Sequence, residues 1–232
     1  MSGLEVKDLT AGYGAEPIIR NVNFRVDSAQ TVAIVGPNGA GKSTFLKAVL
    51  SLLPKSSGHV RVGERDVTGV PTELLASYGL GYVPQVHNVF AQMSVQENLE
   101  VGSFLRRKDM PARIDRIWTL FPDLKAARKR PAGTLSGGQR NMLAVGRALI
   151  TEPDVVILDE PTAGISPLLV NAFWSHIQII KSSGVAVVVV EQNVGRALEE
   201  CDWVYVLVDG TNRVDGPPST LTEREVSRIF LQ

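Results

Sequence analysis

The sequence predicts an α/β fold in which the strands of a parallel sheet alternate with helices. Three apolar runs, at residues 32–35, 155–158 and 185–190, have the length and composition of strands buried on both faces. The first run leads through a glycine-rich turn into a helical pattern, and after Pro153 strand and helix patterns alternate again. A chain of 232 residues is long enough to form one such domain with a substantial core.

The remaining elements are expected in the following order. Residues 4–35 alternate apolar and polar side chains with turn signals between them, which predicts antiparallel strands, and hairpin-like strands follow within 59–67. Between residues 88 and 150 the pattern becomes helical, with Ser94 and Glu97 forming a reciprocal capping pair at one helix start. The sequence therefore predicts a strand-rich core that is interrupted by a helical segment.

The glycine-rich turn has the pattern of a phosphate-binding P-loop, which joins the buried strand at 32–35 to the helical run at 45–50. Glycines let backbone N–H groups point inward at phosphate oxygens, and the following helix adds its positive N-terminal end. Lys42 can reach the β- and γ-phosphates, and the Ser43 hydroxyl can ligate Mg²⁺. A plain glycine-rich turn is the alternative, but the strand–loop–helix context favours a P-loop NTPase that binds a nucleoside triphosphate. The predicted phosphate-binding residues are Gly36, Pro37, Asn38, Gly39, Ala40, Gly41, Lys42, Ser43 and Thr44.

Two carboxylates, Asp159 and Glu160, come directly after the apolar strand at 155–158. Open α/β sheets bind their ligands at the carboxyl ends of the strands. Asp159 is expected to hold Mg²⁺ through its hydration shell, and Glu160 to orient or deprotonate the attacking water. Solvated acids at an ordinary strand end are the alternative. Beside a P-loop, a glutamate directly after the aspartate indicates hydrolysis of the nucleotide rather than its storage.

A third motif, Leu-Ser-Gly-Gly-Gln at 135–139, begins a helical pattern that extends to Ile150. As a lone motif it would be an ordinary helix cap. Between a P-loop and a Val-Val-Ile-Leu-Asp-Glu strand it resembles the signature sequence of ATP-binding cassette (ABC) proteins, and the resemblance covers essentially the whole chain. It implies the ABC ATPase fold, a RecA-like core with an antiparallel β subdomain and an inserted helical subdomain. We expect one domain over 1–232, with the core at 1–87 and 151–232 and the helical subdomain at 88–150.

The resemblance also implies roles for further residues. In ABC proteins the signature of one subunit contacts the γ-phosphate held by the P-loop of another, so that two ATP molecules lie in a head-to-tail dimer. Tyr13 matches the aromatic residue that stacks on adenine. Gln85 matches the glutamine that touches Mg²⁺ or water and begins the segment facing the membrane subunits. The signature residues expected at the nucleotide are Ser136, Gly137, Gly138 and Gln139.

Two positions depart from the usual ABC pattern. Gln192 stands where the family usually has a histidine, and Ser166 stands where an aspartate usually ends the loop after Glu160. Gln192 can donate a hydrogen bond to phosphate, but it cannot carry a charge near neutral pH. The sequence predicts slower or asymmetric hydrolysis at one of two ATP sites, with a partner subunit that supplies the histidine at the other. The predicted catalytic residues are Glu160, Gln192 and Gln85, and the predicted metal ligands are Ser43, Gln85 and Asp159.

A finer resemblance is to the second ATP-binding subunit of branched-chain amino acid importers, a group that is similar in having glutamine at the position of Gln192. The segments that carry it are 121–125, 133–139, 141–144, 166–170 and 190–193. Closely related subunits serve urea and short amides, whereas the segment 83–88 differs from the usual glutamate-glycine-arginine sequence of the group. The resemblance implies a complex with a second, non-identical ATPase, two membrane permease subunits and an external solute-binding protein. An exporter ATPase, a soluble ABC protein and a non-catalytic regulator are the alternatives.

The composition limits the other classes of function. Lys and Arg number 24, as do Asp and Glu, so no overall charge favours nucleic acid as a partner. Cys201 is the single cysteine, which suits a reducing cytosol. The longest apolar run, 185–190, is too short to span a bilayer, and the N-terminal sequence has no secretory pattern. We therefore expect a peripheral protein on the cytoplasmic face of the plasma membrane that acts through its partners.

Overall fold

The computed structural model describes residues 2–53, 55–104, 108–165 and 167–230. Its centre is a six-stranded sheet with the order β10-β9-β3-β8-β7-β6. Five of these strands are parallel, and β10 runs antiparallel to β9 at one edge. The strands are β3 (Thr31–Val35), β6 (Leu80–Val83), β7 (Val155–Asp159), β8 (Ala186–Glu191), β9 (Trp203–Val208) and β10 (Thr211–Gly216).

The two faces of this sheet build two separate cores. Because successive side chains of a strand point to opposite faces, Val187 and Val189 of β8 pack among helices, whereas Val188 and Val190 pack toward a second sheet. Every residue of β3 and β8 is buried. Burial on both faces explains why these strands are continuous apolar runs rather than alternating ones.

The second sheet is antiparallel and has the order β2-β1-β4-β5. Its strands are β1 (Ser2–Gly12), β2 (Ile19–Asp27), β4 (Lys55–Val62) and β5 (Arg65–Asp66). In β2 buried residues alternate with exposed ones, as expected for a sheet with one face toward solvent. The predicted antiparallel strands and hairpin are therefore present, and α1 (Lys42–Val49) packs in the core between the two sheets.

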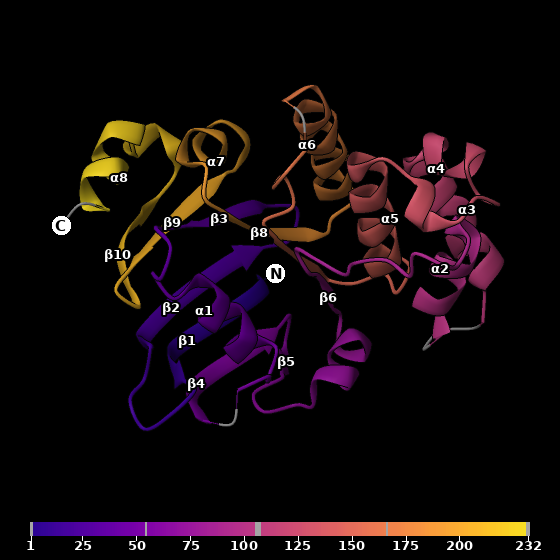
Figure 1. The fold of residues 1–232 in the computed structure, drawn as a ribbon. Helices are drawn as coiled ribbons and strands as arrows, with labels where there is room; N and C mark the ends of the chain where they lie inside the picture. Colours follow the sequence, from indigo (N-terminus) through magenta and orange to yellow (C-terminus); the bar gives the residue numbers. More distant parts are fainter. Residues whose placement is uncertain (1, 54, 105–107, 166, 231–232) are drawn as a thin grey trace.

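The other helices lie mostly on the opposite side of the large sheet. Figure 1 shows α2 to α5 grouped beyond the β6 edge, while α7 and α8 lie toward β9 and β10. Ser94 and Glu97 form the predicted capping box of α2. The helices are α2 (Val95–Gly102), α3 (Met110–Leu120), α4 (Pro122–Ala126), α5 (Gly137–Leu149), α6 (Pro167–Ser182), α7 (Val194–Glu200) and α8 (Glu223–Ile229). Short 3₁₀ turns occur at Thr72–Tyr78, Ala132–Thr134 and Pro218–Thr220.

This architecture confirms the predicted α/β class with an antiparallel sheet and a helical segment. The division into subdomains at residues 88 and 150 stays a prediction. In the described part of the chain, no helix has the length and apolar character needed to cross a membrane.

Candidate active site

The P-loop lies between β3 and α1, and its path is determined by close neighbours. Gly41 has φ of 99°, and a Cβ there would lie 2.7 Å from the Ile19 side chain. A Cβ on Gly36 would run into the Leu207 carbonyl group. Glycine is therefore required at Gly41 for its left-handed backbone and at Gly36 for a close approach of two chain segments.

The beginning of α1 is open to an anion. The first turn of this helix, which the structure describes completely, contains no acidic residue and no side-chain cap. Its free N–H groups and the helix dipole favour a negatively charged ligand. Ser43 is exposed in this turn, so its hydroxyl is accessible next to the loop.

The Lys42 ammonium lies across the P-loop. Its Nζ donates to the carbonyl oxygens of Gly36 at 2.6 Å and Pro37 at 3.1 Å, and the residue is 6% exposed. Burial lowers the pKa of Lys42, and the charges of Glu160 and Asp159 act in the opposite direction. A buried ammonium held by two neutral carbonyls is prepared to bind an anion, because charged acceptors give stronger hydrogen bonds.

Glu160 follows β7 in a conformation that is rare for residues with a Cβ. Its φ is 43°, and its N–H donates to the Val190 carbonyl of β8 at 2.9 Å. The carboxylate accepts hydrogen bonds from Gln85 Nε2 at 2.7 Å and from Gln192 Nε2 at 2.6 Å. The structure thus brings together the three residues predicted as catalytic, although they come from three different loops.

Asp159 lies beside this group in a more enclosed setting. Burial raises the pKa of Asp159, and the charge of Glu160 acts in the same direction. The Tyr82 hydroxyl, which donates to Asp159 Oδ2 at 3.4 Å, acts to lower it, as do Lys42 and Lys47. Burial and the Asp159 charge raise the pKa of Tyr82 to about 12, so Tyr82 remains a donor. Sequence reasoning missed Tyr82; the signal was a polar aromatic residue in the strand that leads to Gln85.

The oxygen donors predicted for Mg²⁺ suit a hard cation. They are one hydroxyl at Ser43, one carboxylate at Asp159 and one amide at Gln85. In the described residues there is no group of three or more His, Cys, Asp or Glu side chains that could form a protein cage for a metal. This set fits Mg²⁺ that arrives with phosphate oxygens, because such sites usually supply few protein ligands and retain several waters.

A buried carboxylate behind Glu160 was also missed by sequence reasoning. Glu191 ends β8, is 5% exposed, and accepts a hydrogen bond from the Thr162 hydroxyl at 2.7 Å. Burial raises the pKa of Glu191. The bond joins the loop after Glu160 to the residue before Gln192. Its only signal in the sequence is an acidic residue at the end of an apolar run.

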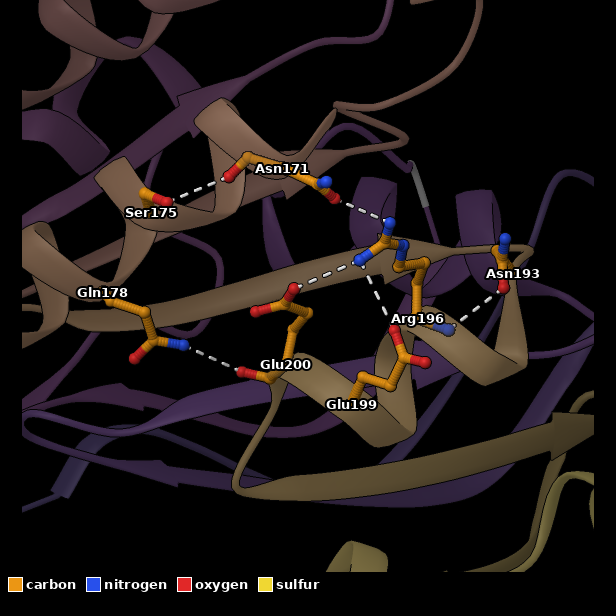
Figure 2. Close-up of polar contacts among 7 residues, drawn as sticks. All are labelled: Asn171, Ser175, Gln178, Asn193, Arg196, Glu199 and Glu200. Atoms are coloured by element: carbon orange, nitrogen blue, oxygen red, sulfur yellow. Dashed lines mark hydrogen bonds and ion pairs between the residues drawn. The ribbon is translucent and has the colours of Figure 1, made fainter. Parts of the chain in front are cut away.

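The loop that carries Gln192 is anchored by α7. Asn193 caps this helix by accepting from the Arg196 N–H at 3.0 Å. Figure 2 shows Arg196 reaching from α7 to α6, where it donates to Asn171 Oδ1 at 2.7 Å. The same guanidinium lies 3.4 Å from a Glu200 carboxylate oxygen. These contacts fix the helix whose N-cap directly follows Gln192.

Tyr13 lies in the bend after β1 and is 53% exposed. Lys47 of α1 donates to the Tyr13 hydroxyl at 3.0 Å, and its Nζ lies 5.1 Å from the ring centroid. The aromatic ring is therefore held beside the helix that follows the P-loop. This is compatible with the predicted contact to adenine, which stays a prediction.

The signature residues form the start of α5. The Ser136 hydroxyl accepts from the Gln139 N–H, and the Gln139 side chain accepts from the Ser136 N–H, each at 3.2 Å. Gly137 and Gly138 form the first turn, and a Cβ on Gly138 would lie 3.3 Å from Leu169. Gln139 therefore acts as a cap, in addition to its predicted contact with nucleotide.

Within this chain the signature and the P-loop are separate. Among the described residues, no hydrogen bond or ion pair joins 136–139 to 36–44. The predicted contact between the signature and the γ-phosphate held by a second subunit stays a prediction. The departure at Ser166 lies outside the described residues.

One cavity among the described residues lies away from this site. It has a volume of about 650 Å³ and lies between α3, the end of α5 and the end of α6. Ile117, Leu149 and Ile180 line it together with Arg113 and Glu152. It contains none of the predicted site residues.

Known proteins share both the sequence and the fold. A probable branched-chain amino acid transport ATP-binding protein LivF of Archaeoglobus fulgidus is 39% identical over 96% of this chain and 95% of its own. The high-affinity branched-chain amino acid transport protein BraG of Pseudomonas aeruginosa is 36% identical over 85% of each chain. The lipopolysaccharide export protein LptB of Escherichia coli is 31% identical over 100% of this chain and 98% of its own.

Solved structures of ABC transporter proteins have the same fold as this chain. The ADP conformation of an ATP-binding cassette of an ABC transporter matches with a TM-score of 0.85, at 26% identity, over 100% of this chain and 96% of that one. The sequence model of the ABC transporter family matches residues 19–163, which include the P-loop, the signature and Glu160. The chain therefore belongs to the ABC transporter family, as an ATP-binding protein whose hydrolysis of ATP is coupled to transport.

Proposed function

We propose that this chain is an ATPase subunit of an importer that takes up branched-chain amino acids. The observation that carries the proposal is the Glu160 carboxylate held by Gln85 and Gln192, because glutamine at position 192 is typical of that importer group. The two importer relatives at 39% and 36% identity support the same assignment. The alternative is the same role in an importer of urea or short amides, because the ATPases of those importers are similar.

The geometry suggests how the residues share the work. The ATP phosphates would lie against the first turn of α1 and Lys42, with the adenine on Tyr13. Mg²⁺, held by Ser43, Asp159 and Gln85, would neutralise phosphate charge when bound. Glu160 would accept a hydrogen bond from the attacking water and orient or deprotonate it, and the two glutamine amides keep its carboxylate in place.

Gln192 would donate a hydrogen bond toward the γ-phosphate without adding charge. We therefore infer slower hydrolysis at the site of this chain than at a site where histidine holds that position. The second ATPase of the complex would supply that histidine. Activity is then expected to depend on the partner ATPase.

An exposed apolar surface supports the contact with membrane subunits. Val86, Phe90, Val101 and Phe104 are between 41% and 64% exposed, and they come from the segment after Gln85 and from α2 and the turn after it. A cavity of about 360 Å³ lies beside them. Clustered exposed apolar residues of this kind mark protein contacts. We propose that two permease subunits bind here, which places the chain at the cytoplasmic face of the plasma membrane, with the solute-binding protein outside.

The first experiment measures ATP hydrolysis by the purified chain, alone and with its co-purifying membrane subunits, beside the variant Glu160→Gln. We expect activity that rises with the subunits and falls by about 10²–10⁴-fold in the variant, because a positioned general base contributes this much. ATPase activity that does not change when the membrane subunits are added would favour a soluble ABC protein. No activity in any assembly would favour a regulator.

The cargo is tested by uptake into cells that lack their own transporters for these solutes. The chain would be expressed with its neighbouring transporter genes, and radiolabelled leucine, urea and acetamide compared. Leucine uptake that is lost in Glu160→Gln supports the proposal. Uptake of urea or acetamide alone would show that the cargo is urea or a short amide instead.

A second candidate is the ATPase of an exporter. It is favoured by the match to a lipopolysaccharide export protein over the whole chain. The lower identity of 31% and the glutamine at position 192 make it the weaker candidate. Co-purification with membrane subunits but without solute uptake in the assay above would favour it.

A further inference from the structure

Asn141 lies in the second turn of α5 and uses both ends of its side-chain amide. Its Nδ2 donates to the Pro161 carbonyl at 2.6 Å, and its Oδ1 accepts from Asn88 Nδ2 at 3.2 Å. Asn141 therefore bridges two loops, one after β6 and one after β7, from a rigid helix. The family motifs described above assign it no role.

The Asn88 side of this bridge ends at the exposed apolar surface. Arg147 of α5 donates to the Asn88 carbonyl at 2.5 Å, and its guanidinium lies 4.5 Å from the centroid of the Phe90 ring. The buried Asn98 bonds both backbone groups of Phe90, at 2.8 and 3.0 Å. Phe90 itself is 46% exposed. A contact made at Phe90 would thus act on a segment whose position α2 and α5 define.

The Pro161 side of the bridge ends at Glu160. Pro161 is buried and directly follows the glutamate, whose backbone has a φ of 43°. Such a conformation persists only when its surroundings hold it. Asn141 holds the chain from the side of α5, and the bond from Thr162 to Glu191 holds it from the side of β8. Movement of the Pro161 carbonyl would therefore displace the Glu160 carboxylate.

We propose that Asn141 is a positioning residue that couples the segment 88–90 to the backbone of Glu160. When the segment moves, the hydrogen bond from Asn88 displaces the Asn141 side chain. The hydrogen bond from Asn141 then displaces the Pro161 carbonyl. Linkage requires the reverse effect as well, so nucleotide bound near Glu160 alters the order of residues 88–90. The inference rests on the proposed role of Glu160 in hydrolysis.

The test is a double-mutant cycle on this chain in its complex with the partner ATPase and the membrane subunits, in which kcat and KM for ATP are measured. Asn141→Leu keeps the branched shape of the side chain and removes both bonds, so kcat is expected to fall about 3- to 10-fold, with KM within about 2-fold of wild type. Asn88→Leu removes one bond and lowers kcat less. The double variant is expected to match Asn141→Leu, because both changes break the same link.

A matched control is Asn212→Leu. The Asn212 side chain accepts from the Asn23 N–H at 2.9 Å between β10 and β2, away from Glu160. This variant is expected to keep the wild-type kcat. If Asn141→Leu does not fold, as judged by its melting temperature, Asn141→Asp replaces it. The aspartate retains the acceptor for Asn88 but sets a carboxylate oxygen against the Pro161 carbonyl, so kcat is again expected to fall.

A second readout separates coupling from a purely structural role. Amide hydrogen exchange at residues 88–93 would be measured with and without ATP in the Glu160→Gln background, where nucleotide persists. ATP is expected to change the exchange rates in that background and to leave them unchanged when Asn141→Leu is added. Wild-type kcat in the Asn141 variants, additive effects in the cycle, or an ATP response that survives Asn141→Leu would each overturn the proposal. If Glu160→Gln itself hydrolyses ATP at the wild-type rate, the proposed role of Glu160 fails instead.

Discussion

At the scale of single residues, Glu160 combines a strained backbone with two amide partners. The glutamines at positions 85 and 192 each occupy one carboxylate oxygen. Neither amide can titrate near neutral pH, so the contacts around the carboxylate do not change protonation in this range. The proposed chemistry of position 192 is therefore independent of pH.

Replacement of Gln192 by histidine tests this. Histidine titrates near pH 6.5, so its charged form is populated only below about that pH. We expect the ratio of Gln192→His kcat to wild-type kcat to increase as the pH falls through about 6.5, because the imidazolium adds positive charge near the γ-phosphate. The measurement is ATPase activity between about pH 5.5 and pH 8. Gln192→Ala, which removes the amide and adds no titrating group, is the matched control. If the ratio of the two kcat values does not change with pH, residue 192 does not lie near the γ-phosphate.

The buried Glu191 gives a prediction about stability. Burial raises its folded-state pKa, so between its ordinary value and the raised value the folded protein keeps a proton that the unfolded chain has released. Stability due to this group is therefore lost as the pH rises through that window. Glu191→Gln removes the charge and retains an oxygen for Thr162. We expect the variant to melt above the wild type near about pH 8, with no advantage near about pH 4.

Thermal melts at several pH values would check this prediction. Glu16→Gln, an exposed glutamate, is the matched control. A Glu191→Gln variant that is less stable at every pH would mean that the charge itself holds Thr162 in place. In that case kcat should fall together with the melting temperature.

At the scale of elements, side-chain hydrogen bonds from Arg196 and Gln178 join α6 and α7. Arg196 bonds Asn171 on α6 and pairs with Glu199 and Glu200 on its own helix (Figure 2). Gln178 adds a bond from α6 to the Glu200 carbonyl at 3.1 Å. Because Asn193, the N-cap of α7, directly follows Gln192, this contact determines how firmly that glutamine is held.

Arg196→Met is expected to loosen α7 while retaining the apolar part of the side chain. The variant should lose about 1 kcal/mol of stability, typical of a partly exposed hydrogen-bonded group. Hydrogen exchange of the α7 amides should accelerate more than that of β8. If exchange rises equally throughout the protein, Arg196 stabilises the whole fold rather than this contact.

At the scale of the whole molecule, no hydrogen bond or ion pair among the described residues joins the P-loop to the signature, and a complete site is expected to need two chains. A mixture of Lys42→Ala and Ser136→Arg chains tests this arrangement. In a mixed head-to-tail dimer one of the two sites has an intact P-loop and an intact signature. We expect each variant to be inactive alone and the mixture to recover about a quarter of wild-type activity if the chain pairs with itself.

The same mixture distinguishes the possible partners. No recovery, together with wild-type activity that requires the second ATPase of the complex, would indicate that this chain pairs only with that different subunit. Measuring ATPase activity over a range of mixing ratios would show whether the active species contains both variants. A single variant that retains full activity would contradict the shared site.

Much of the fold was predictable because local rules determine it. Strands buried on both faces must be continuous apolar runs, and the P-loop and the capping box at Ser94 and Glu97 have local patterns that need few distant contacts. Helical patterns at 112–120 and 124–129, which Phe121 and Pro122 separate, predict the bounds of α3 and α4 to within a few residues. These features follow from the spacing of residues along the chain.

The sequence by itself determined the fold class and the family, and it predicted the phosphate-binding residues. Only the tertiary structure decided which side chains meet: Gln85 and Gln192 at Glu160, Tyr82 at Asp159, Thr162 at Glu191 and Asn141 between two loops. The physical reason is that these contacts join residues far apart in the chain. They form where the carboxyl ends of neighbouring parallel strands meet, and the sheet order that brings them together cannot be read from the spacing of residues in the sequence.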